Sequence, residues 1–184
     1  MSKAIKITLK KAEEGYDPRA SKLFGAPCFP VEWEDKYTEY MDDIIFFGQI
    51  RLEDIAHLDT ENRLPHTGYL YLLLDTELFP YTGYTEYYDG EPRLVIDDFN
   101  EITRFAHLNQ AFLMSFEEAD EDYDGTKLFG VPSSLPDEDG KLLMQFDPLD
   151  EPTGFLEEID GYAYFFFGEG DSKFKDSRWI IDRS

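Results

Sequence analysis

The chain has 184 residues, of which 42% are hydrophobic and 16% aromatic, so it can bury a core without disulfides or metals and is too apolar to be disordered. It carries 40 acidic and 17 basic residues, which gives a formal charge of −23. Residues 1–98 contain 20 acidic and 10 basic residues, and residues 99–184 contain 20 acidic and 7 basic residues. This charge repels phosphate backbones and anionic lipids, which argues against nucleic-acid and membrane partners and favours a basic protein partner. Acidic residues retained for solubility alone are the alternative.

In the first half, apolar residues alternate with Lys and Thr over 5–10, which predicts a half-buried strand. Residues 44–50 are apolar on both faces and are expected to form a central strand, and the apolar stretch 69–74 is expected to form the next strand. A short helix is predicted over 52–58, after the central strand. The run 94–96 is expected to form the last strand of this half.

The second half has a similar series. A helix is predicted over 99–109, because its apolar residues share one helical face. Strands are predicted over 112–116, 142–146, 162–167 and 179–181, with Gly and Pro clusters as the turns between them. The sequence therefore predicts an α+β fold that is mostly β.

Short blocks of sequence recur in the same order in both halves. The block KLFGAP at 22–27 returns as KLFGVP at 127–132. The other matching blocks are 12–17 with 119–124, 47–50 with 143–146, 68–74 with 161–167, and 93–97 with 178–182. The number of residues that separates a block from its match falls steadily along the chain, from 107 to 85. This pattern favours a duplication with shortened loops over chance. We predict a first repeat over 1–98, a connecting helix or linker over 99–110 and a second repeat over 111–184, related by an approximate two-fold and forming one compact domain.

Residues shared by both repeats are expected to serve the fold. Gln49 and Gln145 each lie in an apolar strand, so their amide groups need hydrogen-bond partners once buried. We expect both to bond backbone near the joint between the repeats. A binding role for the two glutamines is the alternative.

Function is expected where the repeats differ, in long aromatic loops of the first repeat that suit contacts with a partner. The candidate binding residues are Trp33, Tyr37, Tyr40, Tyr84 and Tyr87, with Gln49 and Gln145 as further candidates and Tyr81 and Tyr88 in the same loops. Ordinary packing of these aromatic side chains over the core is the alternative.

No catalytic residue, cofactor or metal site is expected. Asp120, Asp122 and Asp124 resemble the start of a calcium loop, but Val131 stands where that loop requires a glutamate, so an acidic turn is preferred. Cys28, the one cysteine, has no histidine placed near it by sequence to act as a base.

Absence of a disulfide, of a signal peptide and of an apolar run long enough to cross a bilayer predicts a cytoplasmic protein. Three functions stay open. The first is a non-catalytic module that binds a basic protein partner, and the second is an enzyme or small-ligand receptor that uses the groove between the repeats. The third is mimicry of DNA by rows of acidic residues.

Several motifs resemble the YwqG-like family, bacterial proteins of unknown function. The motifs are SKLFGAP at 21–27 with FP at 29–30 and Trp33, FGQI at 47–50 with EDI at 53–55, LP at 64–65 with Gly68, and the later blocks 127–132, 142–147 and 161–168. The resemblance covers most of the chain, which is shorter than typical members and has Ser133 and Ser134 where an aromatic residue is expected. It implies a duplicated α+β fold with no established activity. Some relatives are thought to sit near secreted toxin systems, which suggests an immunity-like role.

Overall fold

The computed structural model describes residues 3–38, 43–78, 81–100, 106–134, 141–150, 152–153, 162–168 and 177–181. Ten strands belong to one large sheet: β1 (Ala4–Lys11), β2 (Lys22–Leu23), β4 (Ile44–Arg51), β5 (Tyr69–Asp75), β6 (Thr82–Tyr88), β8 (Phe112–Ala119), β9 (Lys127–Leu128), β10 (Leu142–Phe146), β11 (Ala163–Phe166) and β12 (Arg178–Ile181). A small sheet pairs β3 (Cys28–Phe29) with β7 (Leu94–Val95). The helical segments are η1 (Val31–Trp33), α1 (Glu34–Thr38), η2 (Leu52–Asp54) and η3 (Ala106–Asn109).

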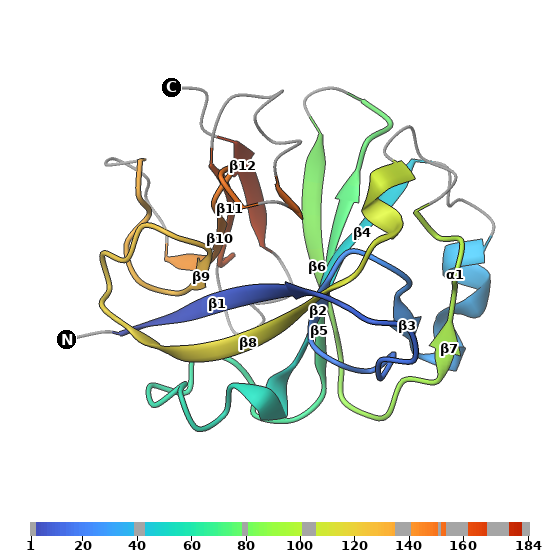
Figure 1. Ribbon diagram of the computed structural model, residues 1–184, viewed down its shortest axis with the longest axis horizontal. Helices are drawn as coiled ribbons and strands as arrows, with labels where there is room; N and C mark the ends of the chain where they lie inside the picture. The colour runs from blue at the N-terminus through green and yellow to red at the C-terminus, as the bar shows by residue number, and fades with distance from the viewer. Residues whose placement is uncertain are drawn as a thin grey trace.

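The large sheet is antiparallel throughout the pairs described and has the order β12-β11-β10-β9-β1-β8-β2-β4-β5-β6 (Figure 1). Its two edge strands, β6 and β12, lie side by side, so the sheet is nearly closed. The predicted mostly β fold is therefore confirmed.

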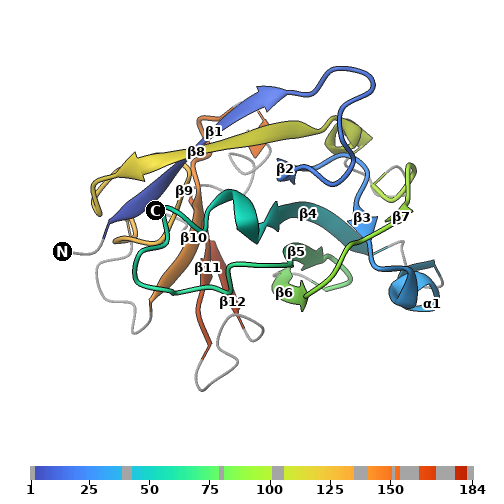
Figure 2. The same cartoon turned by 90° about the horizontal axis from the view of Figure 1, so that it is seen from below.

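The centre of the sheet joins the two halves of the chain, residues 1–98 and 111–184. β1 pairs with β8 along its whole length, from Ala4 opposite Ala119 to Lys11 opposite Phe112. β1 also pairs with β9 of the second half, and β8 pairs with β2 of the first half. In Figure 2 the long ribbons of β1 and β8 cross the molecule together. Each half thus places its first strand next to the second strand of the other half.

The main core fills the inside of the nearly closed sheet. Alternate residues on the strands point inward, as the period of two in a strand requires. Ile5 and Ile7 come from β1, Leu70 and Leu72 from β5, and Phe165 from β11, and all are almost wholly buried. Burial of this apolar surface is the main favourable contribution to folding.

A second apolar layer covers the outer face of β4, β5 and β6. The strand side chains on this face include Phe46, Tyr71 and Leu73. The segment from β3 through η1 to α1 packs over them, and Phe29 and Tyr37 are its buried anchors. This outer layer brings most of the candidate aromatic residues together.

Two expectations for the strands were wrong. The tyrosine-rich stretch that was expected to form loops is the edge strand β6. The block 93–97 does not match 178–182 in structure, because β7 lies in the small sheet whereas β12 lies at the edge of the large sheet, next to β11. Both discrepancies have one cause: β6 has the sequence TGYTEYY, with polar or small residues on both faces, and lacks the apolar run typical of a buried strand.

Helix content is lower than predicted. η2 covers only the start of the helix expected over 52–58, and turns follow it. Of the helix expected over 99–109, residues 101–105 lie outside the described residues, Phe99 and Asn100 form a turn, and η3 is a short 3₁₀ segment. In the described ranges, no helix has the length and apolarity needed to cross a membrane.

The contact between β6 and β12 gives a test of the nearly closed sheet. A Cβ atom added at Gly83 would lie 2.6 Å from Cβ of Trp179, so Gly83→Ala forces the two edges apart. We expect the free energy of unfolding, measured by urea denaturation, to fall by about 1–3 kcal/mol. Thr82→Ala, at the exposed neighbouring position, should change it by less than about 0.5 kcal/mol. Equal stability of the two variants would contradict this packing of the edges.

Candidate functional site

Two lysines with no solvent exposure, Lys22 on β2 and Lys127 on β9, hold the loops around them. Lys22 Nζ donates to the Pro18 carbonyl at 3.0 Å and lies 5.0 Å from the centre of the Tyr16 ring. Lys127 Nζ donates to the carbonyls of Glu121 at 3.0 Å and Val131 at 2.6 Å. Burial lowers the pKa of both lysines to about 8, although nearby carboxylates oppose this shift.

Gln49 and Gln145 complete the polar frame of each half, and both are wholly buried. Gln49 Oε1 accepts a hydrogen bond from Cys28 N at 3.0 Å, and its Nε2 donates to the carbonyl of Ala20 at 3.0 Å. Gln145 Oε1 accepts from Ser133 N at 2.9 Å, and its Nε2 donates to the carbonyl of Gly125 at 2.9 Å. The prediction that both amides bond backbone is confirmed, but the bonds reach loops of the same half and not the joint between the halves.

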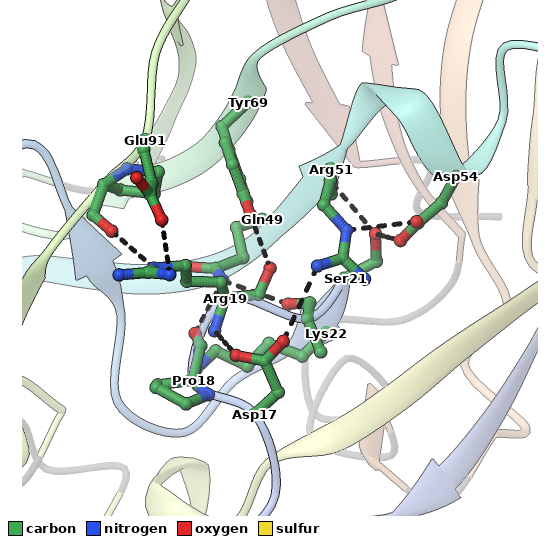
Figure 3. A network of polar contacts seen from close by, with 12 residues as sticks. Asp17, Pro18, Arg19, Ser21, Lys22, Gln49, Arg51, Asp54, Tyr69 and Glu91 are labelled. Carbon is green, nitrogen blue, oxygen red and sulfur yellow. Dashed lines mark hydrogen bonds and ion pairs between the residues drawn. The ribbon is translucent and has the colours of Figure 1, made fainter.

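A network of charged residues surrounds Lys22 and Gln49 (Figure 3). Arg51 Nε donates to Asp54 Oδ1 at 3.1 Å, and its Nη1 lies 3.6 Å from Asp17 Oδ2. Arg19 Nη1 is 2.7 Å from Glu91 Oε1. Each arginine in this network is already paired with carboxylates of the chain itself. The network therefore fixes the loop before β2, and neither Arg19 nor Arg51 is left unpaired for a ligand.

The candidate aromatic residues separate into two groups. Trp33, Tyr37 and Tyr84 meet in the outer layer, where the hydroxyl oxygens of Tyr37 and Tyr84 are 3.5 Å apart. Tyr88 joins them, with its ring centre 6.0 Å from that of Trp33. Tyr87 points to the other face of β6, packs against the main core and donates its hydroxyl to the Thr67 carbonyl.

The remaining two aromatic candidates are not part of this group. Tyr81 is buried in the main core. Tyr40 lies outside the described residues. Fewer of the candidate aromatic residues therefore lie together than the sequence suggested.

A lysine ammonium rests in the outer aromatic layer. Lys36 Nζ lies 5.4 Å from the ring centre of Trp33 and 5.3 Å from that of Tyr37, and it pairs with Glu86 of β6. The Glu86 side chain is only 18% exposed, and its Oε2 atom is buried with no hydrogen-bond partner. We call Trp33, Tyr37 and Glu86 the ammonium cradle. Aromatic faces and a partly buried carboxylate are the groups that bind ammonium and guanidinium ions in proteins.

The charge of the cradle comes from Glu86. Burial raises the pKa of the Tyr37 and Tyr84 hydroxyls, so both stay protonated at neutral pH. Sequence reasoning missed Glu86 and Lys36. The usable signal was the spacing of Tyr84, Glu86 and Tyr88, which puts all three on one face once this stretch is assigned to a strand.

The candidate metal ligands and the Cys28 thiol are not part of the ammonium cradle. Within the parts of the chain that the structure describes, no three His, Cys, Asp or Glu side chains converge as metal ligands. Cys28 is buried, and burial raises the pKa of its thiol, so the thiol is protonated at neutral pH. The cradle can hold a cation, which is a binding function.

Comparison with known proteins adds no relative: no family model matches the sequence, and no curated protein matches it. The resemblance to the YwqG-like family therefore stays a prediction. What the chain binds has to be inferred from the contacts, burial and charge of its own residues.

The buried lysines predict that stability rises with pH. Lysines in an unfolded chain titrate near 10.5, whereas Lys22 and Lys127 titrate at about 8 in the folded protein. Between these two pH values the unfolded chain binds more protons than the folded one, so a rise in pH increases the free energy of unfolding. From pH 7.5 to 9.5 we expect a gain of about 1–2 kcal/mol per lysine in the free energy of unfolding. Lys22→Met should show less than about half the wild-type rise when both are unfolded in urea across this range, because the raised pKa of the Cys28 thiol opposes the rise in both chains. A rise of the same size in the variant would contradict the lowered pKa of Lys22.

Proposed function

We propose that this chain is a non-catalytic binding protein that docks a basic protein partner, with an ammonium or guanidinium group of the partner entering the ammonium cradle. The observation that carries the proposal is the Lys36 ammonium, which lies between Trp33, Tyr37 and Glu86. The cradle thus already holds a group of the proposed chemical class. The Glu86 carboxylate supplies the negative charge of this contact from a position that is largely shielded from solvent.

The surface around the cradle is acidic. Glu32, Glu34 and Asp35 on η1 and α1 are all exposed. Together with the net charge of −23, they would steer a basic partner toward the molecule and raise its rate of association at low salt. The cradle would then supply the specific contact, because exposed carboxylates alone bind weakly and with little selectivity.

Lys36 is the occupant that a partner must displace. Its side chain is 52% exposed, so it can rotate into solvent without unfolding α1. A lysine near the cradle competes with the partner's cation at high effective concentration. The proposal therefore includes a mild self-blocking role for Lys36.

We infer that the halves arose by duplication, with a first repeat over 1–98 and a second over 111–184 around an approximate two-fold between β1 and β8. The support is the matching roles of Lys22 with Lys127 and of Gln49 with Gln145. Membership of the YwqG-like family, a cytoplasmic location and an immunity-like role belong to the same proposal and rest on the sequence motifs.

A second candidate function is binding of a small ligand between the halves. A cavity of about 300 Å³ is lined by Lys6, Ile7 and Leu9 of β1 and by Tyr123 and Asp150 of the second half. Its volume is at the lower end of the range of about 300–1,000 Å³ found for ligand pockets.

The cradle is tested with a fluorescent octalysine peptide at low salt. Glu86→Gln removes the carboxylate charge but keeps the shape, and we expect it to weaken binding about tenfold. Glu53→Gln makes the same change of charge at an exposed position on η2 and should weaken binding less than about twofold. Equal loss in both variants would show that only net charge attracts the peptide and would refute the cradle.

Self-blocking is tested with Lys36→Met, which empties the cradle. We expect this variant to bind octalysine about threefold more tightly than Lys10→Met, which removes the same charge from an exposed position of β1. If the two variants bind alike, Lys36 does not compete with the partner.

A further inference from the structure

The cavity beside β1 exists because β9 is short. β9 pairs with β1 only at Ile5 and Lys6, so further along β1 no described strand lies on that side. Leu9, Phe112 and Pro152 form apolar walls of the resulting space of about 300 Å³. Asp150 places a half-buried carboxylate at its side.

The Asp150 carboxylate is held by the Thr126 hydroxyl, which is itself bonded to a backbone amide. Thr126 Oγ1 donates to Asp150 Oδ2 at 2.6 Å and accepts from Asp147 N at 3.0 Å. Ser21 makes the same pattern in the first half: its Oγ donates to Asp54 Oδ2 at 2.8 Å and accepts from Arg51 N at 2.9 Å. Asp150 therefore has the hydrogen-bonded position of Asp54, and Asp147 has the backbone position of Arg51.

The two positions differ in their charge balance. In the first half the Arg51 guanidinium binds Asp54 Oδ1 at 3.1 Å and neutralises it (Figure 3). In the second half Asp147 replaces the arginine with another carboxylate. Among the described residues no cationic side chain pairs with Asp150, and the space beside it is the cavity. Burial raises the pKa of Asp150, which is the expected effect on a carboxyl group that lacks a cation.

We propose that this cavity binds a small guanidinium compound, whose guanidinium group pairs with Asp150 as the Arg51 guanidinium pairs with Asp54. The proposal rests on the second candidate function and names its ligand class. The apolar walls formed by Leu9 and Phe112 suit the methylene chain of such a compound, and Tyr123 presents an aromatic ring.

Two lysines also line the cavity and narrow the choice of ligand. Lys6 Nζ is 3.5 Å from Glu117 Oε1 and 5.5 Å from the ring centre of Tyr123, so its charge is directed to those groups. Lys11 is exposed and can meet an anionic group at the rim. A compound with both a guanidinium and a carboxylate, such as arginine, satisfies Asp150 and Lys11 together.

Titration calorimetry with free L-arginine tests the proposal. L-citrulline, which has nearly the same shape and a neutral head group, is the matched ligand and should bind at least about tenfold more weakly. Asp147→Arg should neutralise Asp150 as Arg51 neutralises Asp54: we expect it to lose arginine binding at least about tenfold and to raise the melting temperature without ligand. Asp43→Arg makes the same change of charge at an exposed turn and should bind arginine like the wild type.

The outcomes separate this proposal from the broader one. Failure of arginine to bind the wild-type chain, or equal binding by Asp147→Arg and Asp43→Arg, would overturn the guanidinium site. Citrulline binding as tightly as arginine would overturn the ligand class while leaving the cavity as a small-ligand site. If Asp147→Arg does not fold, Asp150→Asn serves instead, and retained arginine binding in that variant would equally overturn the proposal.

Discussion

A lysine ammonium removed from water must find other acceptors, and this requirement shapes both halves of the molecule. Lys22 and Lys127 satisfy it with backbone carbonyls of the loops around β2 and β9. Those loops are then held against β4 and β10 by the amides of Gln49 and Gln145. β2 and β9 are only two residues long, so this polar frame reinforces their short pairing with β8 and β1 at the centre of the sheet.

The features of the polar frame that both halves share explain the fold. The features in which the halves differ indicate function. The first half adds the segment from β3 to α1, which completes an aromatic layer and the ammonium cradle. The second half lacks an arginine to neutralise the half-buried Asp150, and a cavity lies beside that carboxylate. Both differences favour a positively charged ligand, in agreement with a net charge of −23.

Much of the fold could be predicted from the sequence because it depends on local pattern. The strands β1, β4, β5 and β10 follow from alternation or from apolar runs, and buried glutamines in such strands must bond backbone. The neighbours of β1 could not be predicted, since pairing with β8 joins residues more than a hundred positions apart. The cradle was only partly predictable: Trp33 and Tyr37 could be named from their loop, but Glu86 reaches them only through the assignment of β6 to the sheet.

The central claim is that two lysine ammonium groups are buried and bonded to backbone. NMR detection of the side-chain Nζ groups tests it directly, because buried ammonium protons exchange slowly with water and their titration can be followed one lysine at a time. We predict two slowly exchanging signals, from Lys22 and Lys127, that titrate at about 8, below the value of about 10.5 for a lysine in an unfolded chain. Fast exchange of both signals and titration of both lysines near 10.5 would contradict the account.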